Sequence, residues 1–116
     1  MKIADGIICW EKTNGICFYC GIKLDPGTFT LDHFIPRSSG GSNTTENLVP
    51  CCKSCNSVKG TGDIDRLRFN LGRRKAGAPA FSKVQVDWLT SKGVVFPMET
   101  FVFFYESAGI VPPSAH

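Results

Sequence analysis

The stretch "LDHFIPRSSGGSNTTENLVPCCKSCNSVKG", residues 31–60, holds three of the six cysteines and one of the two histidines of this 116-residue chain. It opens with an Asp-His pair, Asp32 and His33, and closes with the sequence C-x-x-C-N at residues 52–56. The sequence CFYC at residues 17–20 carries the same cysteine spacing. An acidic residue and an imidazole are therefore enclosed by two cysteine pairs, and this arrangement is the starting point for fold and function.

The two C-x-x-C pairs predict a structural zinc site. Tetrahedral Zn²⁺ takes four ligands, and a C-x-x-C turn places two sulfurs on one ion at little conformational cost. Two such pairs, with 31 residues between them, would close the site to water, so the metal would hold the fold and do no catalysis. Two disulfides or buried free thiols are the alternative. The predicted ligands are Cys17, Cys20, Cys52 and Cys55.

Two further cysteines are not assigned to the metal. Cys51 is a rival of Cys52, but its distance from Cys55 breaks the x-x spacing. Cys9 lies beside Trp10 in an expected helix, and we expect it in the core.

The composition fits one domain in a reducing compartment. A length of 116 residues suits a single domain, and a chain this short benefits from a metal cross-link. The first residues, MKIADGIICWEKTNG, mix charges with apolar residues and lack the apolar core of a signal peptide. No run of about 18 apolar residues is present. We therefore expect a cytoplasmic protein with reduced thiols and no membrane partner.

The net charge of +3 is unevenly distributed. The segment from Lys53 to Lys75 carries seven basic and two acidic residues, and the rest of the chain is net acidic. Such a segment fits a phosphate-contacting surface, although a solvated helix face is the simpler interpretation of the segment taken alone. The candidate phosphate contacts are Lys53, Lys59, Arg66 and Arg68.

Hydrophobic periodicity and turn residues predict a mixed order of elements. The expected elements are a helix over 3–13, a strand over 28–35, a loop over 36–47, a strand over 47–50, a short helix over 53–58, and amphipathic helices over 63–75 and 81–93, joined by a linker at 76–80.

The two amphipathic helices each predict an apolar face. Ile64, Leu67 and Leu71 are spaced for one face of the first helix. In the second, Ser82 is the expected N-cap and Gly93 the stop, and the residues expected to face the core are Val84, Trp88 and Leu89. The aromatic segment 99–109 fits a strand or a helix, and core packing is favoured over dimerisation. The residues after it are expected to fray.

A lone Asp-His pair is weak evidence, because neighbours on a strand point to opposite faces. The surroundings make it specific. The stretch resembles the core of the HNH nucleases, the ββα-metal endonucleases, whose pattern is C-x-x-C, D-H-x-x-P, G-G, N-L and C-x-x-C-N-x-x-K. The resemblance covers about residues 15–60, and Asn56 stands where many members have histidine. The matching positions are Cys17, Cys20, Asp32, His33, Pro36, Gly40, Gly41, Asn47, Leu48, Cys52, Cys55, Asn56 and Lys59.

This resemblance implies an α+β fold: a small ββα-metal (His-Me finger) core with a four-cysteine zinc site, flanked by helices. We expect one domain over 1–116, with the motif core at about 15–60 and a helical and aromatic extension over 61–116.

The resemblance also implies the role of each motif residue. His33 is the expected general base, and a neutral imidazole suits proton abstraction near neutral pH. Asp32 and Asn56 are the expected ligands of a catalytic cation, and their oxygens suit Mg²⁺ or Mn²⁺. Asn47 is expected to hold the loop and orient the histidine. Lys59, three residues after Asn56, either contacts a phosphate or is a solvated lysine at a helix end.

The expected function is therefore metal-dependent DNA cleavage. Stand-alone phage and prophage HNH proteins of this length suggest a bacterial host cell, with phage terminase or packaging proteins as partners. The alternatives are a non-catalytic zinc module that binds nucleic acid or protein, and a purely structural zinc domain. The sequence does not predict substrate specificity, nicking against double-strand cutting, or oligomeric state.

Overall fold

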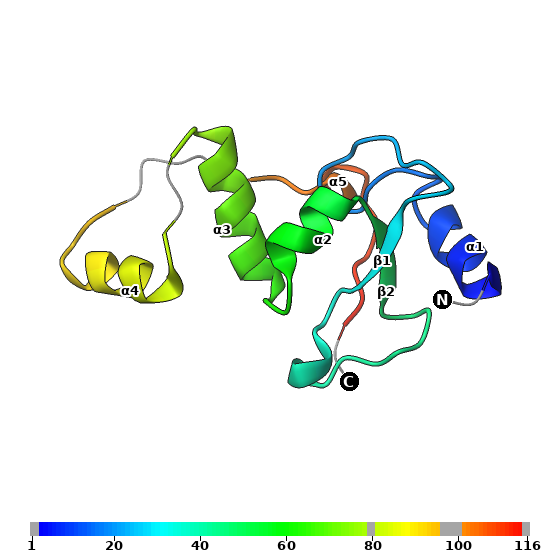
Figure 1. Ribbon diagram of the computed structural model, residues 1–116, viewed down its shortest axis with the longest axis horizontal. Helices are drawn as coiled ribbons and strands as arrows, with labels where there is room; N and C mark the ends of the chain where they lie inside the picture. Colours follow the sequence, from blue (N-terminus) through cyan, green and yellow to red (C-terminus); the bar gives the residue numbers. More distant parts are fainter. Residues whose placement is uncertain (1–2, 79–80, 96–100, 115–116) are drawn as a thin grey trace.

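The computed structural model describes residues 3–78, 81–95 and 101–114 of the chain (Figure 1). The molecule is elongated, with principal extents of 49 × 28 × 24 Å. Its elements, in chain order, are α1 (Ile3–Glu11), β1 (Thr30–His33), a 3₁₀ turn η1 (Arg37–Ser39), β2 (Leu48–Cys51), α2 (Lys53–Lys59), α3 (Ile64–Lys75), α4 (Lys83–Ser91) and α5 (Phe104–Ser107).

The centre of the molecule is a two-stranded antiparallel sheet with a helix docked on it. β1 pairs with β2 in the register that sets Asp32 opposite Val49 and His33 opposite Leu48. Both strands are four residues long. β1 is shorter than the strand predicted over 28–35, because the chain turns away after His33. The α+β class is confirmed, and strand, strand and α2 follow one another as a ββα unit.

Local capping explains where the helices after the sheet begin and end. The Sγ of Cys52 accepts from the backbone N–H of Cys55 at the start of α2, and Gly60 ends that helix at a φ of 53°. Asp63 caps α3 by accepting from the N–H of Arg66 at 2.9 Å. The last turn of α3 is basic, which suits the negative end of the helix dipole.

The core is an aromatic cluster that joins distant parts of the chain. Phe18 stacks on Tyr105 with ring centroids 4.7 Å apart, and Tyr105 stacks on Phe103 at 5.4 Å. The backbone N–H groups of residues 104 and 105 donate to the carbonyls of Tyr19 and Phe18. The aromatic segment is therefore core, as predicted, and its described part is extended up to Phe103 and helical in α5. Residues 99 and 100 of that prediction lie outside the described residues.

The expected face of α3 is confirmed. Leu67 and Leu71 are buried, and Ile64 packs against the core beside them.

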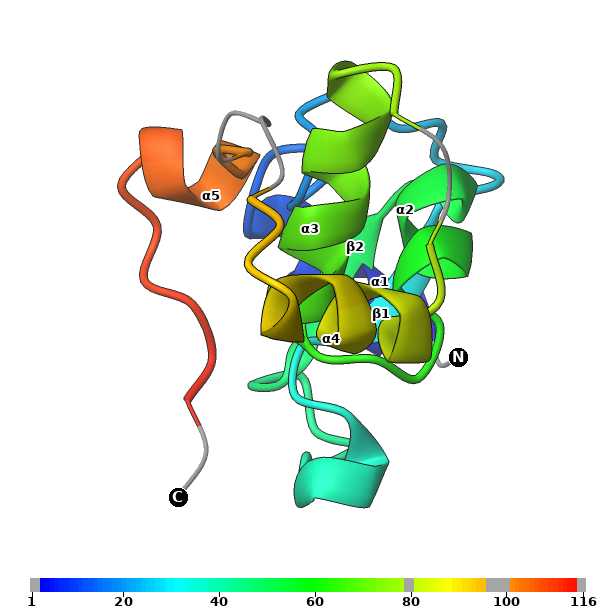
Figure 2. The same cartoon turned by 90° about the vertical axis from the view of Figure 1, so that its left-hand side faces the viewer.

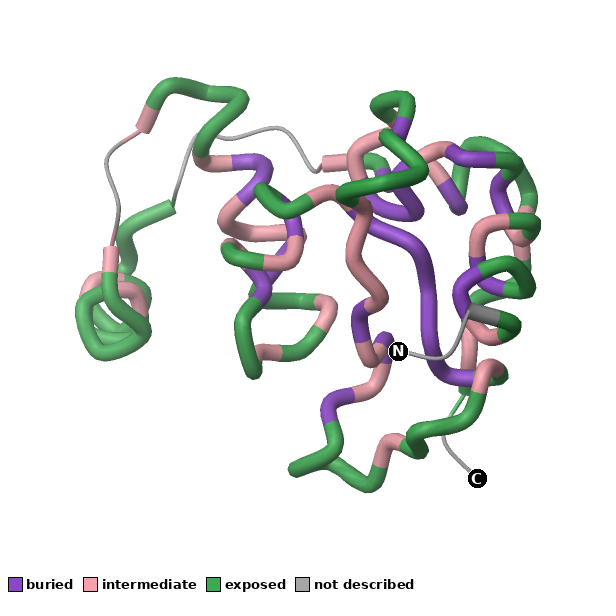
Figure 3. The backbone as a smooth tube through the Cα atoms, turned by 45° about the vertical axis from the view of Figure 1, so that its right-hand side comes forward, coloured by how far each residue is buried: buried purple, intermediate pink, exposed green. Residues whose placement is uncertain are grey.

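The position of α4 differs from the prediction. Ser82 caps the helix with a full capping box, as expected, but the apolar face does not reach the core. Val84 is 78 % exposed and Trp88 is 61 % exposed. Figure 2 shows α4 in front of α3, at the far end from the sheet. In Figure 3 the buried positions gather around the strands, and α4 has none. The segment 101–110 already covers the core, so nothing is left there for α4 to bury.

Within the described ranges, no helix combines the length and the apolar character needed to cross a membrane.

Candidate functional site

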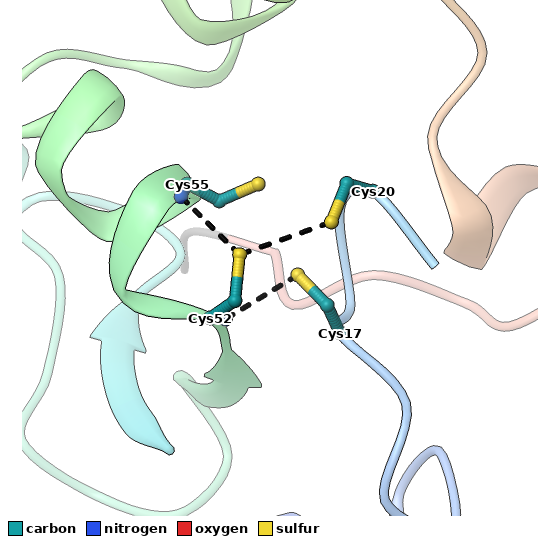
Figure 4. A group of neighbouring side chains, drawn as sticks. All are labelled: Cys17, Cys20, Cys52 and Cys55. Atoms are coloured by element: carbon teal, nitrogen blue, oxygen red, sulfur yellow. Dashed lines mark hydrogen bonds between the residues drawn. The ribbon is translucent and has the colours of Figure 1, made fainter. Parts of the chain in front are cut away.

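Four cysteine sulfurs meet between the turn after α1 and the start of α2. The ligand atoms of Cys17, Cys20, Cys52 and Cys55 all lie within 4.8 Å of one another. Figure 4 shows their side chains converging from the two C-x-x-C segments. The zinc ligands predicted from spacing are thus brought together, while Cys51 is separate and lies against the hydroxyl of Thr30, at 3.3 Å.

This cluster fits a tetrahedral zinc ion. Zinc–sulfur bonds of about 2.3 Å at tetrahedral angles place sulfurs about 3.8 Å apart, and the sulfurs of Cys20 and Cys52 are 3.8 Å apart. The close approach of the thiols affects their acidity: hydrogen bonds from Cys20 and Cys55 lower the pKa of Cys17, and the same bond to Cys17 raises the pKa of Cys55. A dication would replace these hydrogen bonds with four metal–thiolate bonds.

The first cysteine pair is shaped by a tight turn. The N–H of Cys17 donates to Ile22 at 2.8 Å, and Gly21, at a φ of 81°, donates back to Cys17 at 3.1 Å. A left-handed residue here favours glycine. The turn carries Tyr19 between the two ligands, with its ring buried in the aromatic core.

Asp32 is a buried carboxylate with two partners on one oxygen. The Tyr19 hydroxyl donates to Asp32 Oδ2 at 2.5 Å, and the Lys59 ammonium lies 3.0 Å from the same oxygen. Burial raises the pKa of Tyr19, with a further contribution from Asp32, so the phenol stays protonated and donates. Both of these contacts fall on Oδ2 of Asp32 and not on Oδ1.

His33 ends β1 and is partly exposed. Its Nε2 lies 2.6 Å from Oδ1 of Asn43, in the loop between the strands. The sequence pattern did not single out Asn43, because nothing in its spacing distinguishes it from the other polar loop residues.

Asn47 is a buried brace for the same loop. Its Oδ1 accepts from the Ile35 N–H at 3.0 Å, and its Nδ2 donates to the carbonyls of Ile35 and Ser42 at 3.0 and 2.9 Å. These contacts fit the loop-holding part of the expected role. The imidazole itself contacts Asn43 and not Asn47.

Asn56 lies on the inner side of α2. Lys59, three residues later on the same helix face, reaches Asp32, so this face is turned toward β1. Asn56 is partly buried. Asp32 and Asn56 thus lie on two elements that contact each other, β1 and α2.

Two of the four expected phosphate contacts are occupied within the fold. Lys59 is 2 % exposed and donates to the His33 carbonyl at 2.7 Å, so it is not the solvated lysine considered from the sequence. Arg68 pairs with both oxygens of Glu106, at 2.7 and 2.9 Å, and lies over the Phe103 ring. Lys53 and Arg66 are exposed.

A cavity beside the loop between the strands does not include the histidine. Its volume is about 720 Å³, and it is lined by residues including Lys12, Asn47 and Pro112, but not by His33, Asp32 or Asn56.

Comparisons with known proteins place the chain beside HNH endonucleases. Residues 17–71 match the model of a family described as HNH endonuclease. Over 85 residues the chain is 43 % identical to the CRISPR-associated endonuclease Cas9 of Corynebacterium diphtheriae, covering 72 % of this chain and 8 % of that protein. Over 74 residues it is 35 % identical to the type IV methyl-directed restriction enzyme EcoKMcrA of Escherichia coli, covering 54 % of this chain and 27 % of that enzyme.

A solved structure shares the fold. The Type II-C Cas9 enzyme from Actinomyces naeslundii superposes with a TM-score of 0.53 and 24 % identity, over 76 % of this chain and 12 % of that one. The chain thus corresponds to a small part of each of these relatives.

Proposed function

Because residues 17–71 of the chain belong to the HNH endonuclease family, we propose that this protein is a nuclease that hydrolyses phosphodiester bonds in DNA with the help of a divalent cation. The observation that carries the proposal is the link that Lys59 of α2 makes to both motif residues of β1. Its ammonium lies 3.0 Å from Asp32 Oδ2 and donates to the carbonyl of His33 at 2.7 Å, and Asn56 precedes Lys59 by three residues on the same helix.

His33 is the proposed general base. Its imidazole is accessible to solvent, and it accepts a proton from the water that attacks the phosphate. The neighbouring contacts fix its backbone, since Lys59 donates to the carbonyl of His33 and the strand pairing holds its amide plane. The reacting nitrogen is then presented from a rigid strand end.

Asp32 and Asn56 are the proposed ligands of Mg²⁺ or Mn²⁺. When bound, such an ion polarises the scissile phosphate and stabilises the leaving oxygen. Tyr19 and Lys59 serve this site by fixing Oδ2 of Asp32, which leaves Oδ1 to face a cation. A hard oxygen donor set favours these two metals over zinc at this position.

The proposed zinc ion is separate and structural. Four sulfurs complete its tetrahedron, so it has no open position for water or substrate. It ties the turn before β1 to the start of α2, and so fixes the two segments that carry Tyr19 and Asn56.

The proposed path of the DNA follows the exposed cations after the motif. Lys53, Arg66, Arg74 and Lys75 are exposed, and Arg74 lies 3.3 Å from Ser54 at the start of α2. Contacts of this kind supply affinity without base recognition. Assistance to phage DNA packaging, a terminase partner and a cytoplasmic location rest on the resemblance alone and stay predictions.

The test is cleavage of supercoiled plasmid by the purified, zinc-loaded protein. We expect nicked or linear product with Mg²⁺ or Mn²⁺, none from the zinc-loaded protein when no further cation is added, and none with His33→Ala. The matched control is His116→Ala, which removes the other histidine of the chain and should leave cleavage unchanged. Metal-dependent cutting by a pure His33→Ala sample would contradict the assignment of the base.

A second function has one observation in its favour. The ammonium of Lys59 pairs with the carboxylate of Asp32, as would suit a non-catalytic zinc module that binds nucleic acid. Salt-sensitive DNA binding without cleavage under any divalent cation would support that module and reject the nuclease.

A further inference from the structure

We infer that Asn43 is a positioning residue, which holds the imidazole of His33 in the tautomer with its proton on Nε2 and leaves Nδ1 to accept the proton of water. The inference rests on the proposed function, because the tautomer matters to catalysis only if His33 is the base. Its central observation is the distance of 2.6 Å between His33 Nε2 and Asn43 Oδ1.

The chemistry of an amide decides the direction of this hydrogen bond. A side-chain amide oxygen only accepts, so the ring nitrogen that faces it must donate. A neutral imidazole carries one N–H, so donation from Nε2 leaves the free lone pair on Nδ1. Rotating the amide by half a turn would exchange its donor and acceptor, and for this reason the experiment reads the position of the proton directly.

The loop that carries Asn43 is pressed against the end of β1. A Cβ at Gly41 would lie 1.8 Å from the carbonyl oxygen of Ile35, so only glycine fits there. Next to it, the carbonyl of Ser42 accepts from the buried Nδ2 of Asn47 at 2.9 Å. The residue before Asn43 is thus held by two independent contacts.

The other side of Asn43 is held as well. The ammonium of Lys12 donates to the carbonyls of Thr45 and Leu48, the latter at 2.6 Å. Asn43 therefore lies between two anchored segments, and its side chain is delivered to the histidine by a braced loop.

This hydrogen bond is exposed. Its loss should therefore affect protein stability and catalysis to different extents. An exposed hydrogen bond contributes little to the free energy of folding. Its loss should change the tautomer and the turnover number much more than the melting temperature. A loop residue that only stabilised the fold would show the opposite pattern.

The experiment combines ¹⁵N spectroscopy with steady-state cleavage on the full chain. His116→Gln leaves His33 as the sole histidine, and the spectra are taken under mildly alkaline conditions, where free imidazole is neutral. The variants are Asn43→Ala, which removes the acceptor, Asn43→Asp, which keeps an acceptor at the same place, and Thr44→Ala. The last is the matched control, since it removes a hydrogen bond of the same loop without touching His33.

We expect Nε2 protonated and Nδ1 unprotonated in the parent and in Asn43→Asp. Asn43→Ala should give a mixture of tautomers and about a tenfold lower kcat with little change in KM, the size expected for one lost hydrogen bond. Thr44→Ala should keep both the parent spectrum and the parent kcat.

Three results would overturn the inference: a parent protein protonated on Nδ1, an Asn43→Ala spectrum equal to that of the parent, or an equal loss of kcat in Thr44→Ala. The spectra do not need cleavage. A parent that holds the Nε2–H tautomer but cuts no DNA therefore rejects the proposed function and the catalytic part of this inference, while the contact itself is established.

Discussion

Lys59 illustrates how much one buried cation can organise. Its ammonium is within 3.0 Å of Asp32 Oδ2 and donates to the carbonyl of His33 at 2.7 Å. The two residues that point to opposite sides of β1 are therefore held through the same side chain. This contact was not visible in the sequence, where the spacing from Asn56 fixes the helix face of Lys59 but not what that face meets.

At this scale we predict that Lys59→Met destabilises the fold. The substitution leaves the Asp32 carboxylate buried with Tyr19 as its remaining partner, and an unpaired buried charge costs about 3–5 kcal/mol. Urea denaturation of the zinc-loaded protein measures the free energy of unfolding. Lys53→Met, an exposed position on the same helix, should change it by about 0.5 kcal/mol or less. Equal values for the two variants would show that the ion pair is unimportant.

At the scale of the elements, the side chain of Arg68 joins α3 to the aromatic segment, residues 101–109. The guanidinium pairs with Glu106, lies 4.4 Å from the centroid of the Phe103 ring and donates to the Phe101 carbonyl at 2.6 Å. These partners are more than 30 positions away in the sequence. The basic pattern of the helix therefore suggested a phosphate contact, while the fold uses this arginine internally.

We predict that Arg68→Ala lowers the free energy of unfolding by about 1–2 kcal/mol, through the lost cation–π contact and hydrogen bond to Phe101. Arg66→Ala, exposed on the same helix, should have little effect on stability. The difference in the free energy of unfolding between Arg68→Ala and Arg66→Ala should depend on pH. Arg68 holds the pKa of Glu106 below its ordinary value, so the contribution of the pair is present above the ordinary glutamate pKa and is lost as the pH falls through the lowered one. Thermal melts with excess zinc, from neutral pH down to the lowest pH at which the metal stays bound, measure this, and a pH-independent difference would contradict it.

The elements also show what a pattern can and cannot predict. The N-cap at Ser82, the basic helix α3 and both cysteine pairs follow from local chemistry, and the structure has them. The burial of Trp88 was wrong, because amphipathicity identifies an apolar face but not the surface that covers it. Asn43 was missed for the same reason: its contact with His33 is made by a loop whose path depends on Gly41 and Asn47.

At the scale of the whole molecule, the four-cysteine cluster joins the two ends of the motif, residues 17–20 and 52–55. We predict one zinc ion per chain by elemental analysis, and loss of near-UV circular dichroism when a strong chelator removes it. Cys55→Ser should lose the metal and the fold together. Cys51→Ser is the matched control, since Cys51 is buried but lies outside the cluster, and it should retain zinc. Loss of zinc from Cys51→Ser alone would reject the assigned ligand set.

The backbone contacts between residues 18–19 and residues 104–105 have a consequence for synthesis. All four cysteines have been translated when the chain reaches residue 55, about 50 residues before Tyr105. At about 5–20 residues per second, the ribosome needs roughly 3–10 seconds for that interval. A nascent chain can thus bind its metal before residues 104 and 105, whose backbone N–H groups donate to the carbonyls of Tyr19 and Phe18, have been made. Tyr19 is the residue that donates to Asp32. The proposed metal ligand Asp32 therefore gains its complete surroundings only after residues 104 and 105 have been made.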